Sequence, residues 1–196
     1  MGRRSDHSRE QLEAMIVAEG HRLMAESGFA GFSAREVARR VGYSVGTLYN
    51  IFDSLDHLLI AINSRTFELW TAYLRERMEG SQGDRIRALV EAYFDFARQH
   101  PQLWMAIYDH RLPPGVGMPQ PDMEKRRALT QIVFDEVARQ LPKRSAEKVE
   151  QLTRSLIATV HGHCTYELNG SFALMGEKDP VALALARVRD AIEAAR

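Results

Sequence analysis

The spacing of apolar residues constrains the fold of this chain more than any other feature. Apolar side chains recur every three or four positions through nearly all of the 196 residues, and alternation of β-branched and polar residues is absent. Spacing of three to four places side chains on one face of an α-helix, whereas a strand needs a spacing of two. The sequence therefore predicts an all-α fold.

Serine residues mark where several of these helices begin. A serine side chain caps a helix because its oxygen accepts an orphan backbone N–H in the first turn. Ser8 with Gln11, and Ser33 with Glu36, have the spacing of a capping box, in which each residue caps the other. We expect about nine helices, at residues 8–27, 33–41, 44–50, 55–78, 84–99, 102–110, 122–140, 146–168 and from the Asp179 cap and Pro180 to residue 196.

Residues 33–50 have the pattern of a helix-turn-helix. Two short capped segments are joined by a turn that contains Gly42, and their apolar residues are spaced to pack the segments together. The second helix of such a pair enters the major groove of DNA. Its outward side chains are small and polar, and such groups hydrogen-bond phosphates or base edges. A pair of this shape also occurs in ordinary helical domains.

Charge gives only local support for DNA binding. The formal net charge is zero, and residues 1–54 hold seven arginines, seven acidic residues and no lysine. A global basic field is therefore absent, and any cations for phosphates must be local. The candidates are Arg3, Arg4, Arg35, Arg39 and Arg40, although an arginine cluster is also typical of a solvated surface.

The stretch "ESGFAGFSAREVARRVGYSVGTLYNIFDSLDHLL" resembles the DNA-binding domain of the TetR family of transcriptional regulators. The matching residues are Gly28, Phe32, Ser33, Val37, Ala38, Gly42, Ser44, Gly46, Thr47, Leu48, Tyr49, Phe52, Leu58 and Leu59. The resemblance implies a three-helix DNA-binding domain at residues 1–54 and a helical ligand-binding and dimerisation domain at residues 55–196. "WMAIYDH" and "VHGHCTYELNG" resemble a subgroup with a His-Gly motif.

The resemblance also implies which residues contact DNA, namely Tyr43, Ser44, Val45, Thr47 and Tyr49. Gly46 would let the helix approach the DNA backbone closely, or it would only relieve crowding between the two short helices. One departure matters. The family usually has a lysine where this chain has Leu55, so we expect one phosphate contact fewer.

Residues beyond about 84 carry the expected ligand site. Aromatic, sulfur-containing and histidine side chains there could line a pocket, although the same spacing is typical of plain core. The candidates are Phe94, Trp104, Met105, Tyr108, Met123, Phe134, His161, Cys164, Tyr166 and Phe172, with the segment from Pro113 to Pro121 as a gate.

A metal site, a cofactor and catalysis are not expected. His161 and Cys164 share a helix face, but two candidate ligands do not make a metal site. A small helical enzyme that uses these two residues remains an alternative. The chain has one cysteine, no signal-peptide pattern and no apolar run near the ~20 residues that span a bilayer, so we expect a cytoplasmic protein without a membrane segment.

The last two long helices have apolar stripes that fit a dimer seam, or that pack within the chain. With the resemblance, they predict a homodimer whose two recognition helices bind a palindromic DNA operator. The expected function is a transcriptional regulator, most simply a repressor that a small-molecule effector releases. The alternative is a helical adaptor or ligand-binding protein with weakened DNA binding.

Overall fold

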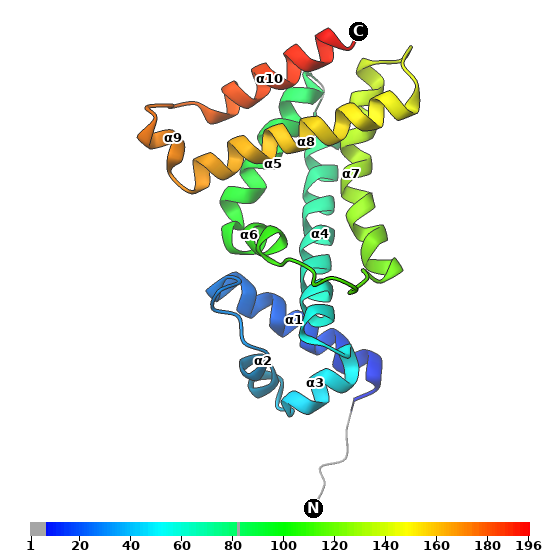
Figure 1. The fold of residues 1–196 in the computed structure, drawn as a ribbon, viewed down its shortest axis with the longest axis vertical. Coiled ribbons are helices and arrows are strands. Elements are labelled where there is room, and N and C mark those ends of the chain that lie inside the picture. Colours follow the sequence, from blue (N-terminus) through cyan, green and yellow to red (C-terminus); the bar gives the residue numbers. More distant parts are fainter. Residues whose placement is uncertain (1–6, 82) are drawn as a thin grey trace, which may run out of the picture. The chain divides into compact units, whose positions relative to one another are not determined.

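The computed structural model describes residues 7–81 and 83–196, and every regular element within these ranges is a helix (Figure 1). The all-α prediction is confirmed. The described ranges contain ten helices: α1 (Arg9–Ser27), α2 (Ala34–Val41), α3 (Val45–Phe52), α4 (Leu55–Glu79), α5 (Arg85–Gln99), α6 (Pro101–Asp109), α7 (Gln120–Gln140), α8 (Ala146–Leu168), α9 (Ser171–Leu174) and α10 (Pro180–Ala194). Nine of them match predicted helices, and the four-residue α9 is additional.

The chain divides into two compact units that are not contiguous in sequence. Unit 1 comprises Met1–Glu68 and His100–Arg126, and unit 2 comprises Leu69–Gln99 and Arg127–Arg196. Helices α4 and α7 contribute residues to both units. The predicted boundary between residues 54 and 55 separates a DNA-binding domain from a ligand-binding domain. It is not a boundary between the two compact units, and it stays a prediction.

Unit 1 is built around one hydrophobic core. Helices α1 to α4 each contribute buried side chains to it, and α6 adds Leu103 and Ala106, which are 3% and 0% exposed. Full burial of a leucine side chain stabilises a fold by about 1.5–3 kcal/mol. A helix 50 residues downstream of the helix-turn-helix is therefore part of the core that holds it.

The predicted caps are present, with one difference. Ser8 and Gln11 form the reciprocal capping box, since each side chain accepts the other's backbone N–H. Ser33 accepts the N–H of Glu36 at 3.4 Å. The Glu36 carboxylate, however, bonds Arg39 and Arg40 instead of the Ser33 backbone. The second capping box is therefore wrong as a reciprocal pair, because two arginines compete for its carboxylate.

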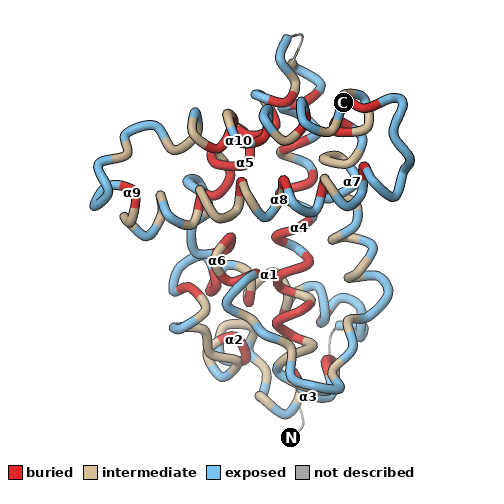
Figure 2. Tube along the Cα trace, turned by 45° about the horizontal axis from the view of Figure 1, so that its top comes forward, coloured by how far each residue is buried: buried red, intermediate tan, exposed pale blue. Residues whose placement is uncertain are grey.

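Unit 2 packs α10 against α8 and α5 (Figure 1). Trp70 stacks on Phe96, with ring centroids 4.9 Å apart and planes 3° apart. Much of the apolar stripe of α10 is buried, and Figure 2 colours the buried residues red. Its members Ala184, Leu185, Val188 and Ile192 are at most 4% exposed. Packing within the chain, one of the two alternatives for this stripe, therefore holds for these four residues.

Candidate nucleic-acid interface

A left-handed turn sets how α2 and α3 meet. Gly42 adopts φ 77° and ψ 25°, which a residue without Cβ reaches at little cost. The Tyr43 N–H that follows donates to the Ala38 carbonyl at 2.9 Å and closes the last turn of α2. Val37 and Leu48, both fully buried, bring the two helices into the same core. The pair has the connection and packing of a helix-turn-helix.

Ser44 and Thr47 are bonded to each other at the start of α3. The Ser44 oxygen accepts the Thr47 N–H at 3.1 Å, and the two hydroxyl oxygens lie 2.9 Å apart. Each hydroxyl carries one hydrogen, and their mutual bond uses only one of the two. One hydroxyl hydrogen is therefore still available for a phosphate oxygen, while the cap fixes both side chains.

Two tyrosines flank these hydroxyls and differ in their surroundings. The Tyr49 side chain on α3 is 39% exposed. The Tyr43 hydroxyl lies 3.0 Å from Nδ1 of His7, and its ring meets the His7 ring edge-on. Tyr43 and Val45 are also partly buried against the core of unit 1. Tyr49 is thus the more accessible of the two tyrosines.

Gly46 is exposed, and its surroundings leave room for a side chain. A Cβ built at this position meets only the Ser44 hydroxyl oxygen within 4 Å, at 3.6 Å, which is ordinary van der Waals contact. Relief of crowding between α2 and α3 therefore does not explain this glycine. The predicted close approach of DNA to the surface of α3 is the alternative, and it stays a prediction.

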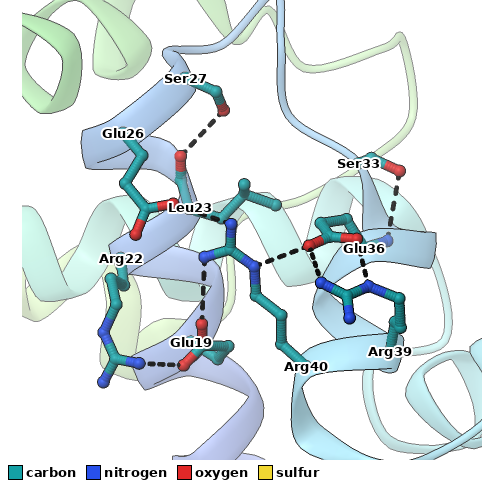
Figure 3. Close-up of polar contacts among 9 residues, drawn as sticks. All are labelled: Glu19, Arg22, Leu23, Glu26, Ser27, Ser33, Glu36, Arg39 and Arg40. Atoms are coloured by element: carbon teal, nitrogen blue, oxygen red, sulfur yellow. Dashed lines mark hydrogen bonds and ion pairs between the residues drawn. The ribbon is translucent and has the colours of Figure 1, made fainter.

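Arg40 joins α1 to α2 (Figure 3). Its guanidinium bonds Glu19 at 3.2 Å and Glu26 at 2.8 Å, both on α1, and Glu36 at 2.9 Å within α2. Arg39 bonds the same Glu36 carboxylate through two nitrogens. Both arginines are therefore engaged by carboxylates of the protein itself, and their expected role as cations for phosphates stays a prediction.

The pKa values in this cluster follow from these bonds. Hydrogen bonds from Arg39 and then Arg40 lower the pKa of Glu36 to about 2. The bond from Arg40 also lowers the pKa of Glu26. The carboxylates raise the pKa of Arg40 in return, with Glu26 as the largest cause. Glu26, Glu36 and Arg40 are consequently ionised at neutral pH.

Arg35 lies exposed on α2, and no hydrogen bond or ion pair joins it to another described residue. Arg3 and Arg4, the other predicted cations, fall outside the described residues. Leu55 is 41% exposed in the first turn of α4, so a side chain there faces solvent. Ser54 caps this helix by accepting the His57 N–H at 3.1 Å.

The predicted ligand-site residues are distributed over both units. Unit 1 contains Trp104, Met105 and Tyr108, and unit 2 contains Phe94, Phe134, His161, Cys164 and Tyr166. Trp104, Phe94 and Cys164 are fully buried, whereas Tyr166 is 49% exposed. Phe134 borders a groove of unit 2 with residues of α7 and α8. Tyr93 and His161 are joined by a bond of 3.1 Å between the hydroxyl and Nδ1.

Cys164 lacks the properties of a nucleophile. Its side chain is fully buried, and burial together with the Glu167 carboxylate raises the pKa of the thiol to about 12. A reactive cysteine needs a lowered pKa, because the thiolate is the nucleophile. Among the described residues, no group of three or more His, Cys, Asp or Glu side chains could hold a metal ion.

Unit 1 contains a cavity of about 330 Å³, and most of its wall residues were not among the predicted ligand residues. Of the predicted ligand residues, only Tyr108 lines it. The other wall residues are Ile60, Asn63, Ser64, Ile107, His110, Leu112, Met118 and Arg126. Buried polar residues at positions 63 and 64, on a helix face that is otherwise apolar, are the signal in the sequence that could have indicated it.

Family models match most of the chain. Residues 16–62 match the model "Bacterial regulatory proteins, tetR family", and residues 86–190 match "Tetracyclin repressor-like, C-terminal domain". The second match alone covers more than half of the chain. The chain therefore belongs to the TetR family, and its α1–α3 region is the helix-turn-helix part of that family.

Curated relatives carry regulator names. The HTH-type transcriptional regulator Rv1816 of Mycobacterium tuberculosis is 32% identical over 117 residues, which are 58% of this chain and 50% of that protein. The chain thus spans about half the length of the first curated relatives it matches. The HTH-type transcriptional activator FasR of Mycolicibacterium smegmatis is 25% identical over 82% of this chain and 74% of its own length.

Solved structures share the fold. A protein of unknown function from Rhodococcus sp. RHA1 superimposes with a TM-score of 0.72 at 22% identity, over 98% of both chains. The structure of RolR in complex with the ligand resorcinol superimposes with a TM-score of 0.67 at 18% identity, over 95% of this chain and 94% of that one. Within the described residues, no helix has the length and apolar character needed to cross a membrane.

Proposed function

We propose that this protein is a DNA-binding transcriptional regulator whose recognition helix is α3. The observation that carries the proposal is the surface of α3 itself. It presents Tyr49 and the Ser44–Thr47 hydroxyl pair to solvent, and Gly46 leaves the backbone between them uncovered. Hydroxyl groups at the start of a recognition helix suit phosphates and base edges.

Fixed geometry, rather than bulk charge, is what makes this surface suitable for DNA. The left-handed Gly42 turn orients α3, and the Ser44 cap holds the hydroxyls in place. Arg40 ties α2 to α1 with three carboxylates. Preorganised donors lose little conformational freedom on binding, which compensates in part for a modest positive charge.

Two copies are needed to read a palindromic operator. We infer a homodimer through α8 and α10, because Val181 and Leu183 of α10 and Tyr166 of α8 remain partly or largely exposed after the inner stripe is buried. A two-fold axis would present two α3 helices to half-sites about one DNA turn apart. Binding to chromosomal DNA implies a cytoplasmic protein.

Release by a small-molecule effector completes the proposal. The relative RolR was solved with resorcinol and EbrR with imidazole, which supports a ligand-responsive regulator. An effector would act by binding the DNA-incompetent arrangement of the dimer better than the competent one. Repression is the simplest outcome. Because the similar protein FasR is named an activator, a transcription assay has to decide between repression and activation.

The test is selection of duplex DNA from a random library with the purified protein, followed by fluorescence anisotropy on the selected sequence. Tyr49→Phe should weaken binding about tenfold, since it removes a hydrogen bond to a charged phosphate. Tyr73→Phe removes the hydroxyl of a tyrosine on α4 that belongs to unit 2, and it should leave affinity unchanged. Recovery of no preferred sequence, or equal effects of both variants, would favour the adaptor alternative.

A further inference from the structure

The cavity of unit 1 has apolar walls and a polar end. Ile60 on α4, Ile107 on α6, and Leu112 and Met118 on the segment before α7 supply the apolar part. Its volume of about 330 Å³ lies at the lower end of the range for small-molecule sites. Lys125 and Glu68, 3.0 Å apart, join α7 to α4 beside it. The walls therefore suit a compact molecule with an apolar body.

A guanidinium gives the polar end a positive charge. Arg126 lines the cavity, and its guanidinium carbon lies 4.7 Å from the centroid of the buried Phe67 ring. Burial lowers the pKa of Arg126, and the nearby Tyr108 opposes that shift. Arginine nevertheless stays charged at neutral pH. A partly desolvated cation interacts more strongly with an anion than one in bulk water does.

A buried acceptor lies on the α4 wall. Asn63 is 3% exposed, and its amide nitrogen donates to the Ala106 carbonyl at 3.4 Å. That bond identifies the other amide atom as the oxygen, and this Oδ1 has no hydrogen-bond partner among the described residues. Unpaired buried acceptors are uncommon, because each loses its hydration without compensation.

From these three features we propose that the cavity of unit 1 is the effector site and takes a small organic carboxylate with an apolar body and a hydroxyl donor. Arg126 binds the carboxylate, Asn63 Oδ1 accepts from the hydroxyl, and the apolar walls enclose the body. Only the regulatory role of the ligand, as an effector of DNA binding, rests on the proposed function. Binding of the ligand is a property of the cavity alone.

A hydrogen bond connects the cavity wall to the start of α4. His110 Nε2 lies 3.0 Å from a carboxylate oxygen of Asp56, in the first turn of that helix and four residues after α3 ends. The His110 ring also lies 6.1 Å from the ring of Phe29, which packs against the core of the helix-turn-helix. A ligand that moves His110 therefore acts on groups that position α3, within one compact unit.

The experiment is calorimetric titration of the full chain, without DNA, with 4-hydroxybenzoate, benzoate and 4-hydroxybenzamide. The hydroxy acid should bind most tightly, and the amide about tenfold or more weakly because it lacks the charge. Arg126→Gln should abolish the preference for the acid over the amide. Arg127→Gln, which removes a charge from the next position of the same helix, should keep it.

Asn63→Leu tests the donor requirement separately. In this variant the Ala106 carbonyl loses the Asn63 amide but still accepts the His110 N–H, which lies at 3.2 Å. The fold should therefore be retained. Benzoate should then bind as well as 4-hydroxybenzoate, whereas the wild type prefers the latter. Failure of all three probes to bind the wild type, or identical behaviour of Arg126→Gln and Arg127→Gln, would overturn the assignment.

DNA binding is measured in a second titration, so that the two proposals fail separately. If 4-hydroxybenzoate binds and lowers affinity for the selected duplex, both proposals are supported. If the protein binds no DNA but the calorimetric preferences hold, the cavity assignment stands and the regulator proposal fails. Release of DNA that persists unchanged in Arg126→Gln would place the effector elsewhere and overturn the cavity assignment.

Discussion

Gly46 and Gly42 lie four residues apart, yet a methyl group would have opposite effects at the two positions. Gly46→Ala should stabilise the protein by up to about 0.4–1 kcal/mol, because Cβ fits and the unfolded chain loses freedom. DNA affinity should fall, since the methyl group separates α3 from the duplex. Denaturant unfolding and anisotropy measure the two effects.

Gly42→Ala is the matched comparison. At φ 77° an alanine is strained, so this variant should lose about 1–2 kcal/mol. Gly46→Ala with unchanged affinity would mean that close approach is not the reason for the glycine.

Cys164 should be inert in the folded protein. With a pKa of about 12 and no exposed surface, its thiol should react with iodoacetamide only as fast as the protein opens, at neutral pH. In denaturant it should react at the rate of a free thiol. Mass spectrometry of labelled protein gives both rates, and rapid labelling of the native state would revive the enzyme alternative.

Leu55 is the residue that departs from the family pattern at the first turn of α4. Because it is 41% exposed, Leu55→Lys should fold normally and add one phosphate contact. The slope of log affinity against log salt should then steepen by roughly one unit. Anisotropy at several salt concentrations provides the slope, with Leu69→Lys, at an equally exposed leucine further along α4, as the control. An unchanged slope would mean that this position does not face the phosphates.

At the scale of elements, the joint between α1 and α2 depends on Arg40. Arg40→Gln should lower the melting temperature more than Arg39→Gln, since Arg39 bonds only within α2 whereas Arg40 also bonds Glu19 and Glu26 on α1. It should also weaken DNA binding by letting α2 and α3 reorient. Calorimetric melting and anisotropy of both variants distinguish them, and equal melting temperatures would contradict a bridging role.

The Glu36 carboxylate, which bonds Arg39 and Arg40 within α2, has a defined pH dependence. The pKa of Glu36 falls from 4.5 to about 2 on folding, so its contribution is fully present above about pH 4.5. That contribution should be lost progressively as the pH falls toward 2. In Arg40→Gln, the difference in melting temperature from wild type should therefore shrink over this window.

The helices themselves could largely be predicted, because capping and periodicity are local properties. Gly42 ends α2 and Ser44 begins α3 as expected, and Pro180 begins α10 behind the Asp179 cap. The four-residue α9 was missed since its N-cap, Gly170, makes no side-chain cap bond. The sequence also did not reveal that Arg39 and Arg40 would take the Glu36 carboxylate, which depends on side-chain geometry.

The cavity of unit 1 could be predicted less well than the helix-turn-helix. Periodicity indicates which face of a helix is buried, but not which other helix covers it. Tyr108 was therefore predicted because aromatic residues often line pockets. Asn63 and Arg126 could be recognised as wall residues only once the structure showed that α4 and α7 line one cavity. The resemblance can name candidate DNA-binding residues because they lie within one short contiguous stretch, and these contacts stay a prediction.

At the scale of the whole molecule, the order of the chain and the order of folding units differ. A fragment of residues 1–80 contains α1–α4 but lacks Leu103 and Ala106, which complete the core around the helix-turn-helix. We expect it to unfold without a cooperative transition, as judged by circular dichroism during heating. A cooperative transition close to that of the full chain would show that α6 is dispensable for this core.

The contribution of α6 to that core bears on how such regulators can be recombined. If residues 1–54 of this chain were joined to the remainder of a relative, α1 would pack against an α6 of different sequence. Such a chimera would therefore exchange part of a hydrophobic core and not an independently folding domain. Successful chimeras should carry residues 100–126 along with the N-terminal segment. Substitutions in these two distant stretches would then have to be inherited together, because both stretches contribute to one core.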